Sequence, residues 1–132
     1  MRLARAVFTF AGVWGFLVLT PFYFSFDAIG RLYPPPITHA DLFYGFLAVT
    51  VAWQVAFLII GSDPARFRPL MIPAMVEKFL YVTSLAVLWL QGRLRTTEFA
   101  ITFPDCVLGI LFALAFVRVG RSRSGDAVIR RH

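Results

Sequence analysis

Residues 6–26 read AVFTFAGVWGFLVLTPFYFSF and residues 42–62 read LFYGFLAVTVAWQVAFLIIGS, each stretch running for 21 positions without a charged side chain. A helix of that length rises about 30 Å, the thickness of the hydrocarbon core of a bilayer. Two further apolar stretches, 73–92 and 99–119, carry their charges toward their ends. The sequence predicts an all-α integral membrane protein, a four-helix bundle with helices over about 6–26, 41–61, 73–92 and 102–119.

The composition agrees with this fold class. Of the 132 residues, 59% are apolar and only 15% are charged, unlike a soluble globular domain. The net charge of +6 comes from arginine, because Lys78 is the only lysine. Basic cytoplasmic loops explain such an excess in a membrane protein. We therefore expect a lipid bilayer as partner and no nucleic acid, with one four-transmembrane-helix domain over residues 1–120 and a basic, disordered cytoplasmic tail over 121–132.

The first apolar stretch follows Arg2 and Arg5, as the core of a signal peptide would. It is too long and too aromatic for that role, however, and no small-x-small cleavage site follows it. We expect it to be retained as a membrane helix.

The basic residues are distributed unevenly between the two ends of the expected helices. Three of them, Arg31, Arg93 and Arg95, fall on one side. The other side holds ten: Arg2, Arg5, Arg66, Arg68, Lys78, Arg118, Arg121, Arg123, Arg130 and Arg131. The positive-inside rule then places both termini in the cytoplasm.

Several residues predict where helices begin or end. Pro21 is expected to kink or end the first helix. Thr38, with Asp41 three residues later, is typical of a capping box at the start of the second. Asp63 followed by Pro64 indicates a short turn at the membrane interface.

Small side chains mark one face of the second helix, at Gly45, Ala48, Ala52 and Ala56. Such faces let membrane helices approach closely. We expect this face to pack inside the bundle; the alternative is a contact with a second copy of the chain or with another membrane protein.

Polar side chains form a stripe on the third helix. Glu77, Tyr81, Ser84, Leu88 and Gln91 recur with a heptad-like spacing. The second helix adds Thr50 and Gln54, one turn apart. Because polar groups facing hydrocarbon are unfavourable, we expect a polar interior. Its candidate residues are Thr50, Gln54, Glu77, Tyr81, Ser84 and Gln91. They form either interhelical hydrogen bonds or a pocket for a small ligand.

Charged groups at the helix ends need a separate interpretation. Glu77 lies one turn inside the membrane, where it is expected to pair with Arg66, Arg68 or Lys78, the residues that could also contact lipid headgroups. A candidate outer rim is formed by Asp27, Arg31, His39, Asp41 and Asp105. It is either a binding or catalytic rim or an ordinary solvated surface.

The sequence lacks the motifs of common membrane cofactors. The only histidines, His39 and His132, do not lie within a helix span, so a bis-histidine haem is not expected. Cys106 is the only cysteine, and no cluster has metal-ligand spacing. We expect no cofactor, no metal and no catalytic residue.

The segment GSDPARFRPLM (61–71), followed by Glu77 and Lys78, resembles uncharacterised small four-helix inner-membrane proteins of bacteria. This resemblance implies a location in the bacterial inner membrane and no particular chemistry.

Three hypotheses for function remain. The first is a non-enzymatic accessory, assembly or regulatory subunit, which would have a closed, dry interior. The second is binding or transport of a small solute, lipid or quinone, which requires an interior cavity. The third is a membrane enzyme acting on a lipid, which needs an acid and a base within hydrogen-bond reach at a cleft.

Overall fold

The computed structural model describes residues 1–129, and its regular elements are all helices in that range. They are α1 (Arg2–Leu19), the 3-10 helix η1 (Thr20–Phe24), α2 (Phe26–Leu32), α3 (Ala40–Ser62), the 3-10 helix η2 (Arg68–Leu70), α4 (Met71–Leu90), α5 (Thr96–Ala100) and α6 (Phe103–Ile129). Four segments are long and apolar enough to cross a membrane: Arg2–Phe24, Ala40–Ser62, Arg68–Leu90 and Thr96–Ala127. Four such segments are the pattern of an integral membrane protein, in agreement with the sequence analysis.

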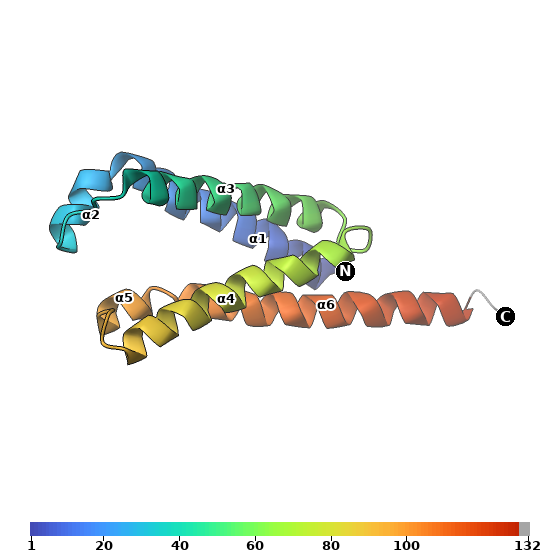
Figure 1. Ribbon diagram of the computed structural model, residues 1–132. Coiled ribbons are helices and arrows are strands. Elements are labelled where there is room, and N and C mark those ends of the chain that lie inside the picture. The colour runs from blue at the N-terminus through green and yellow to red at the C-terminus, as the bar shows by residue number, and fades with distance from the viewer. Residues whose placement is uncertain (130–132) are drawn as a thin grey trace.

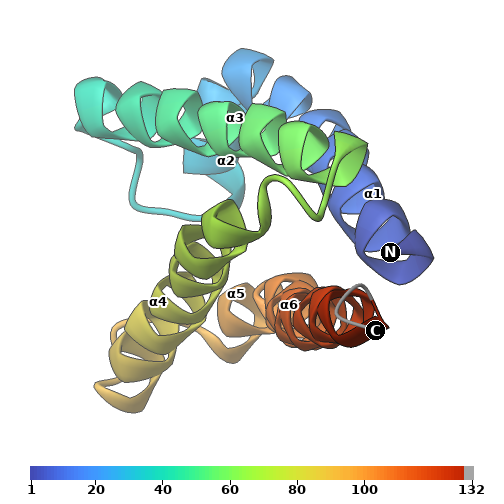
Figure 2. The same ribbon diagram turned by 90° about the vertical axis from the view of Figure 1, so that its right-hand side faces the viewer.

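The long helices form two pairs, α1 with α3 and α4 with α6 (Figure 1). The pairs lie together at the end that holds the N-terminus and the α3–α4 connection. They diverge toward the opposite end, which carries α2 and α5 (Figures 1 and 2). We call these the closed end and the open end. The result is a V of two splayed pairs, a looser arrangement than the four-helix bundle that the sequence predicts.

An aromatic joint holds the two pairs together at the closed end. Phe8 of α1, Phe57 of α3 and Phe112 of α6 are completely buried. The rings of Phe8 and Phe112 stack with centroids 4.2 Å apart, and Phe57 meets Phe112 edge-on at 5.0 Å. The buried core around the joint contains Ala4, Val7, Ala11, Ile60, Met71, Ala74, Leu108, Ala115 and Val119.

Glycines permit the close packing of α1 against α3. A Cβ atom at Gly61 would lie 2.5 Å from Oγ1 of Thr9, and one at Gly12 would lie 2.7 Å from the side chain of Leu58. The face expected to pack, which begins at Gly45, instead points outward: Gly45 is exposed, and in the described structure a Cβ there would meet nothing within 4 Å. Ala48 and Ala52 on the same face are exposed too.

The ends of the helices follow local backbone chemistry. α1 ends at Leu19, two residues before Pro21, and continues as η1. At the end of α4, Gly92 has φ 71°, and the N–H groups of Gly92 and Arg93 donate to the carbonyls of Trp89 and Leu88. This is the hydrogen-bond pattern of a Schellman cap, which needs glycine at the left-handed position.

Two predicted helix starts can be compared with the structure. α3 begins at Ala40 with His39 as its N-cap and no capping side chain among the described residues, so the expected capping box of Thr38 and Asp41 is wrong. Asp63 does accept a hydrogen bond from the backbone N–H of Arg66, at 3.1 Å, and so caps the turn before η2.

α6 extends further than the sequence suggests. Its expected end at residue 119 is too early, because the helix continues to Ile129. The disordered tail expected over 121–132 is therefore corrected for residues 121–129, which are helical and mostly exposed. Hydroxyl-to-carbonyl hydrogen bonds one turn back, from Ser122 to Arg118 and from Ser124 to Gly120, accompany this helical stretch. Residues 130–132 lie outside the described residues.

Candidate ligand-binding cleft

A cleft of about 1210 Å³ lies between the two helix pairs. Small-molecule pockets generally have volumes of about 300–1,000 Å³, so this space exceeds what a drug-sized ligand fills. Both pairs line it, together with the segments at the open end. Most of its lining is apolar and includes Trp14, Val18, Phe22, Phe46, Leu85 and Trp89.

One wall of the cleft carries three charged side chains. Nζ of Lys78 donates a hydrogen bond of 2.6 Å to Oδ1 of Asp105, and the same nitrogen lies 3.4 Å from Oε2 of Glu77. Lys78 is 5% exposed, and its ammonium group lies 5.3 Å from the ring centroid of Phe57. We call Glu77, Lys78 and Asp105 the polar wall. It lies beside the aromatic joint, where the two pairs begin to separate.

The polar wall lies inside the span of the membrane helices. At a rise of about 1.5 Å per residue, Lys78 lies about 10 Å from Met71 and about 18 Å from Leu90, the two ends of α4. Charged groups at such depth are unfavourable unless they are paired or line a cavity, and they mark functional positions in membrane proteins. Here they are both paired and at a cavity.

Glu77 is the least satisfied of the three. Its Oε2 atom is buried and has no hydrogen-bond partner among residues 1–129, although it lies within ion-pair distance of Lys78. Its side chain as a whole keeps 21% exposure, toward the cleft that it lines. An unmatched acceptor at this depth suits a ligand that brings a donor.

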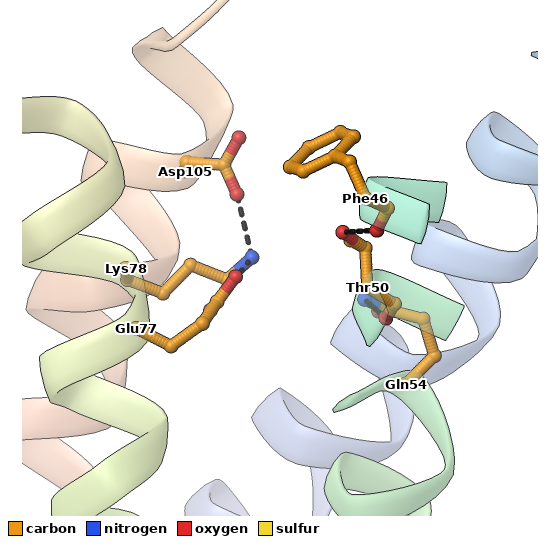
Figure 3. A network of polar contacts seen from close by, with 6 residues as sticks. All are labelled: Phe46, Thr50, Gln54, Glu77, Lys78 and Asp105. Carbon is orange, nitrogen blue, oxygen red and sulfur yellow. Dashed lines mark hydrogen bonds and ion pairs between the residues drawn. The ribbon is translucent and has the colours of Figure 1, made fainter. Parts of the chain in front are cut away.

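The opposite wall is formed by α1 and α3, and Figure 3 shows three of the α3 residues, Phe46, Thr50 and Gln54. Oγ1 of Thr50 donates to the carbonyl of Phe46 at 2.7 Å, and Nε2 of Gln54 donates to the carbonyl of Thr50 at 2.9 Å. Gln54 is only 2% exposed because its side chain lies over Gly15 of α1, where a Cβ atom would overlap it. Closer to the open end, the rings of Phe46 and Tyr81 approach across the cleft, with centroids 6.4 Å apart.

The structure divides the candidate polar interior into two groups. Thr50, Gln54, Glu77 and Tyr81 all line the cleft. Ser84 and Gln91 are exposed and do not line it, so their expected interior position is wrong. The residues of α4 that line the cleft are Glu77, Lys78, Tyr81, Leu85 and Trp89. At about 100° per residue, Ser84 and Gln91 lie to one side of Glu77 around α4, whereas the cleft-lining Tyr81, Leu85 and Trp89 lie to the other side.

The candidate outer rim also divides. Asp27, Arg31, His39 and Asp41 are exposed near α2 and the start of α3, and none of them lines the cleft. Asp105, in the first turn of α6, does line the cleft and accepts the hydrogen bond from Lys78. Lys78 and Asp105 could have been recognised in the sequence as opposite charges inside two separate apolar stretches. The sequence analysis instead placed them on opposite sides of the membrane.

Of the three cations expected to pair with Glu77, Lys78 contacts it, whereas Arg66 and Arg68 contact other groups. Nε of Arg68 donates to the carbonyl of Phe116 at 3.1 Å, and its guanidinium lies 3.9 Å from the centroid of that ring. Arg66 lies over the ring of Phe67, at 5.3 Å. Both arginines stay at the closed end, more than two turns before Glu77, so Lys78 is the cation that Glu77 contacts.

Comparison with known proteins adds no relative: no protein-family model, curated sequence or solved structure matches this chain. Within residues 1–129, no three His, Cys, Asp or Glu side chains gather closely enough to hold a metal ion. Any functional reading of the cleft therefore comes from its own residues.

Proposed function

We propose that this protein binds an amphipathic small molecule, with a long apolar body and one polar group, in the cleft between its helix pairs. The observation that carries the proposal is the polar wall, which lies within the span of the apolar helices on the side of a large and mostly apolar cleft. An apolar lining with a few convergent polar groups is typical of small-molecule sites.

The cleft favours binding over the two other hypotheses. An accessory subunit with a closed, dry interior has no use for a space of about 1210 Å³. An enzyme needs a free acid and base, whereas Lys78 and Asp105 are occupied by their mutual hydrogen bond. Binding requires only the space and the polar group that the cleft already provides.

A cavity-filling variant tests the proposal. Leu85 is half-buried and lines the cleft, so Leu85→Trp should occupy the space of the ligand. Leu80, on the same helix, is 62% exposed and does not line it, which makes Leu80→Trp the matched control. Both variants and the original protein are purified from native membranes, and the extracted small molecules are compared by mass spectrometry.

The expected result is a bound amphiphile, at close to one molecule per chain, that copurifies with the original protein and with Leu80→Trp but is lost from Leu85→Trp. Equal recovery of the same lipids from all three proteins, or recovery of bulk membrane lipid alone, would contradict the proposal. Thermal unfolding of each variant shows whether Leu85→Trp has kept its fold.

We also propose that the closed end faces the cytoplasm of a bacterial inner membrane. The N-terminal arginines, the loop before α4 and the second half of α6 all lie at this end of the molecule (Figure 1). A hydrogen bond of 3.4 Å from Arg123 to the carbonyl of Ala65 joins two of these basic segments. Such a concentration of arginine is what the positive-inside rule associates with the cytoplasmic side.

A further inference from the structure

With both carboxylates ionised, the polar wall carries one more negative charge than positive charge. Glu77 and Asp105 together carry two carboxylates, and Lys78 supplies a single ammonium group, which Asp105 binds at 2.6 Å. Glu77 stays at 3.4 Å from the same nitrogen, with its Oε2 atom unmatched by any hydrogen bond in the described chain. A net charge of −1 in a region of low dielectric attracts a positive charge strongly.

The open end of the cleft has the opposite balance. Arg93, Arg95 and Glu98 line it there, giving a net charge of +1. The cleft is thus negative at its base and positive at its mouth. This polarity holds a cation at the base, beside Glu77, and disfavours it at the mouth, whereas an anion would be drawn to the arginines.

Aromatic rings also suit a cation at this position. Tyr81 lies one helical turn from Glu77 on α4, and Phe46 faces it from α3 with ring centroids 6.4 Å apart. The faces of aromatic rings attract ammonium groups, most strongly where water is excluded.

We propose that the molecule bound in the cleft is a cationic amphiphile, whose ammonium group pairs with Glu77 and whose chain runs along the apolar lining toward the open end. This inference rests on the proposed function, to which it adds the chemical class of the ligand. The ammonium group supplies the charge and the donor that the polar wall lacks, so that two cations face two carboxylates.

The test compares three amphiphiles that differ only in their head group. Three long-chain amphiphiles with identical brominated tails carry an ammonium, a hydroxyl or a carboxylate head, and each is added to the full-length protein in nanodiscs of zwitterionic lipid. Bromine quenches tryptophan, and Trp14 and Trp89 both line the cleft. Quenching at equal mole fraction in the bilayer gives the relative affinities. A charge-assisted hydrogen bond predicts that the ammonium amphiphile binds about ten- to a hundredfold more tightly than the alcohol.

A variant that removes the charge of Glu77 tests whether this residue causes the preference for the ammonium head. Glu77→Gln keeps the shape of the side chain and removes the surplus charge, so it should weaken ammonium binding about tenfold or more and leave alcohol binding nearly unchanged. Asp41→Asn removes an exposed carboxylate outside the cleft and should change neither.

The outcomes separate the two proposals. Saturable quenching that is equal for all three heads, or strongest for the alcohol or the carboxylate, overturns the cationic ligand and leaves a binding cleft. No saturable quenching by any of the three overturns both. The comparison of heads uses the unaltered protein, so it decides the matter even if Glu77→Gln fails to fold.

Discussion

Nζ of Lys78 and Oδ1 of Asp105 are 2.6 Å apart, and their bond joins the interior of α4 to the first turn of α6. α6 therefore begins well short of the open end of α4. The chain between them fills the intervening depth with α5, which the stacked rings of Trp89 and Phe99, 5.0 Å apart, hold against the end of α4. The bond fixes the register of the α4–α6 pair and shapes one wall of the cleft.

Loss of this bond should destabilise the protein. Asp105→Asn leaves Lys78 with Glu77 alone, at 3.4 Å. Breaking a fully buried pair costs about 3–5 kcal/mol, and because the Asp105 side chain is 27% exposed we expect about 2 kcal/mol. The free energy of unfolding in mixed detergent micelles measures it, with the exposed Asp41→Asn as control. In a double-mutant cycle with Lys78→Met we expect a coupling energy of about 1–3 kcal/mol; additive losses would show that the bond contributes nothing.

The aromatic joint should be the most sensitive packing site. Phe112→Ala removes a completely buried ring that contacts both Phe8 and Phe57, and should cost about 3–5 kcal/mol of unfolding free energy. Phe103→Ala, on the same helix at a position 70% exposed, should cost less than about 1 kcal/mol. Similar losses for the two variants would mean that the helix pairs are not joined here.

Two glycines of α3 should respond oppositely to alanine. Gly61→Ala places a methyl group 2.5 Å from Oγ1 of Thr9 and 3.0 Å from its backbone nitrogen, so it should destabilise the α1–α3 pair by about 1–3 kcal/mol. Gly45→Ala enters open space within a helix and should stabilise it, by up to about 1 kcal/mol. Thermal unfolding of both variants measures the difference; a larger loss at Gly45 would restore the small-residue face expected from the sequence.

Labelling of introduced cysteines tests the orientation. In a Cys106→Ser background, Ser124→Cys at the closed end should react with an impermeant thiol reagent only after the cells are opened. Pro35→Cys, in the loop of the open end, should react in intact cells whose outer membrane has been made permeable. Both positions are exposed, so accessibility within the fold is not limiting. The reverse pattern would place the closed end outside.

The four membrane segments could be predicted from the sequence because their signal is additive. Each holds about twenty apolar residues, and no single side chain decides the outcome. Pro21 gave a correct end for α1 for a similarly local reason: a proline cannot donate the next hydrogen bond of the helix. The continuation of α6 past Gly120 was missed, since its polar residues resemble a disordered tail as much as an exposed helix.

The site was harder to predict because it depends on which helices pair and how far each is rotated. Thr50, Gln54, Glu77 and Tyr81 were placed at the cleft by their polarity alone. Ser84 was misplaced because the side of α4 that faces the cleft carries Tyr81, Leu85 and Trp89 and is rotated away from the centre of the predicted stripe. The bond between Lys78 and Asp105 spans 27 positions of the chain, and the sequence contains no information on the depth at which α6 begins.

The divergence of the helix pairs gives the molecule a wedge-shaped outline in the membrane. Its cross-section at the open end is larger than at the closed end, where the aromatic joint draws the helices together. An inclusion of that outline displaces unequal numbers of lipids from the two leaflets, and a bilayer relieves the imbalance by bending. The protein should therefore concentrate where the membrane bends so that the leaflet at the open end lies on the convex side.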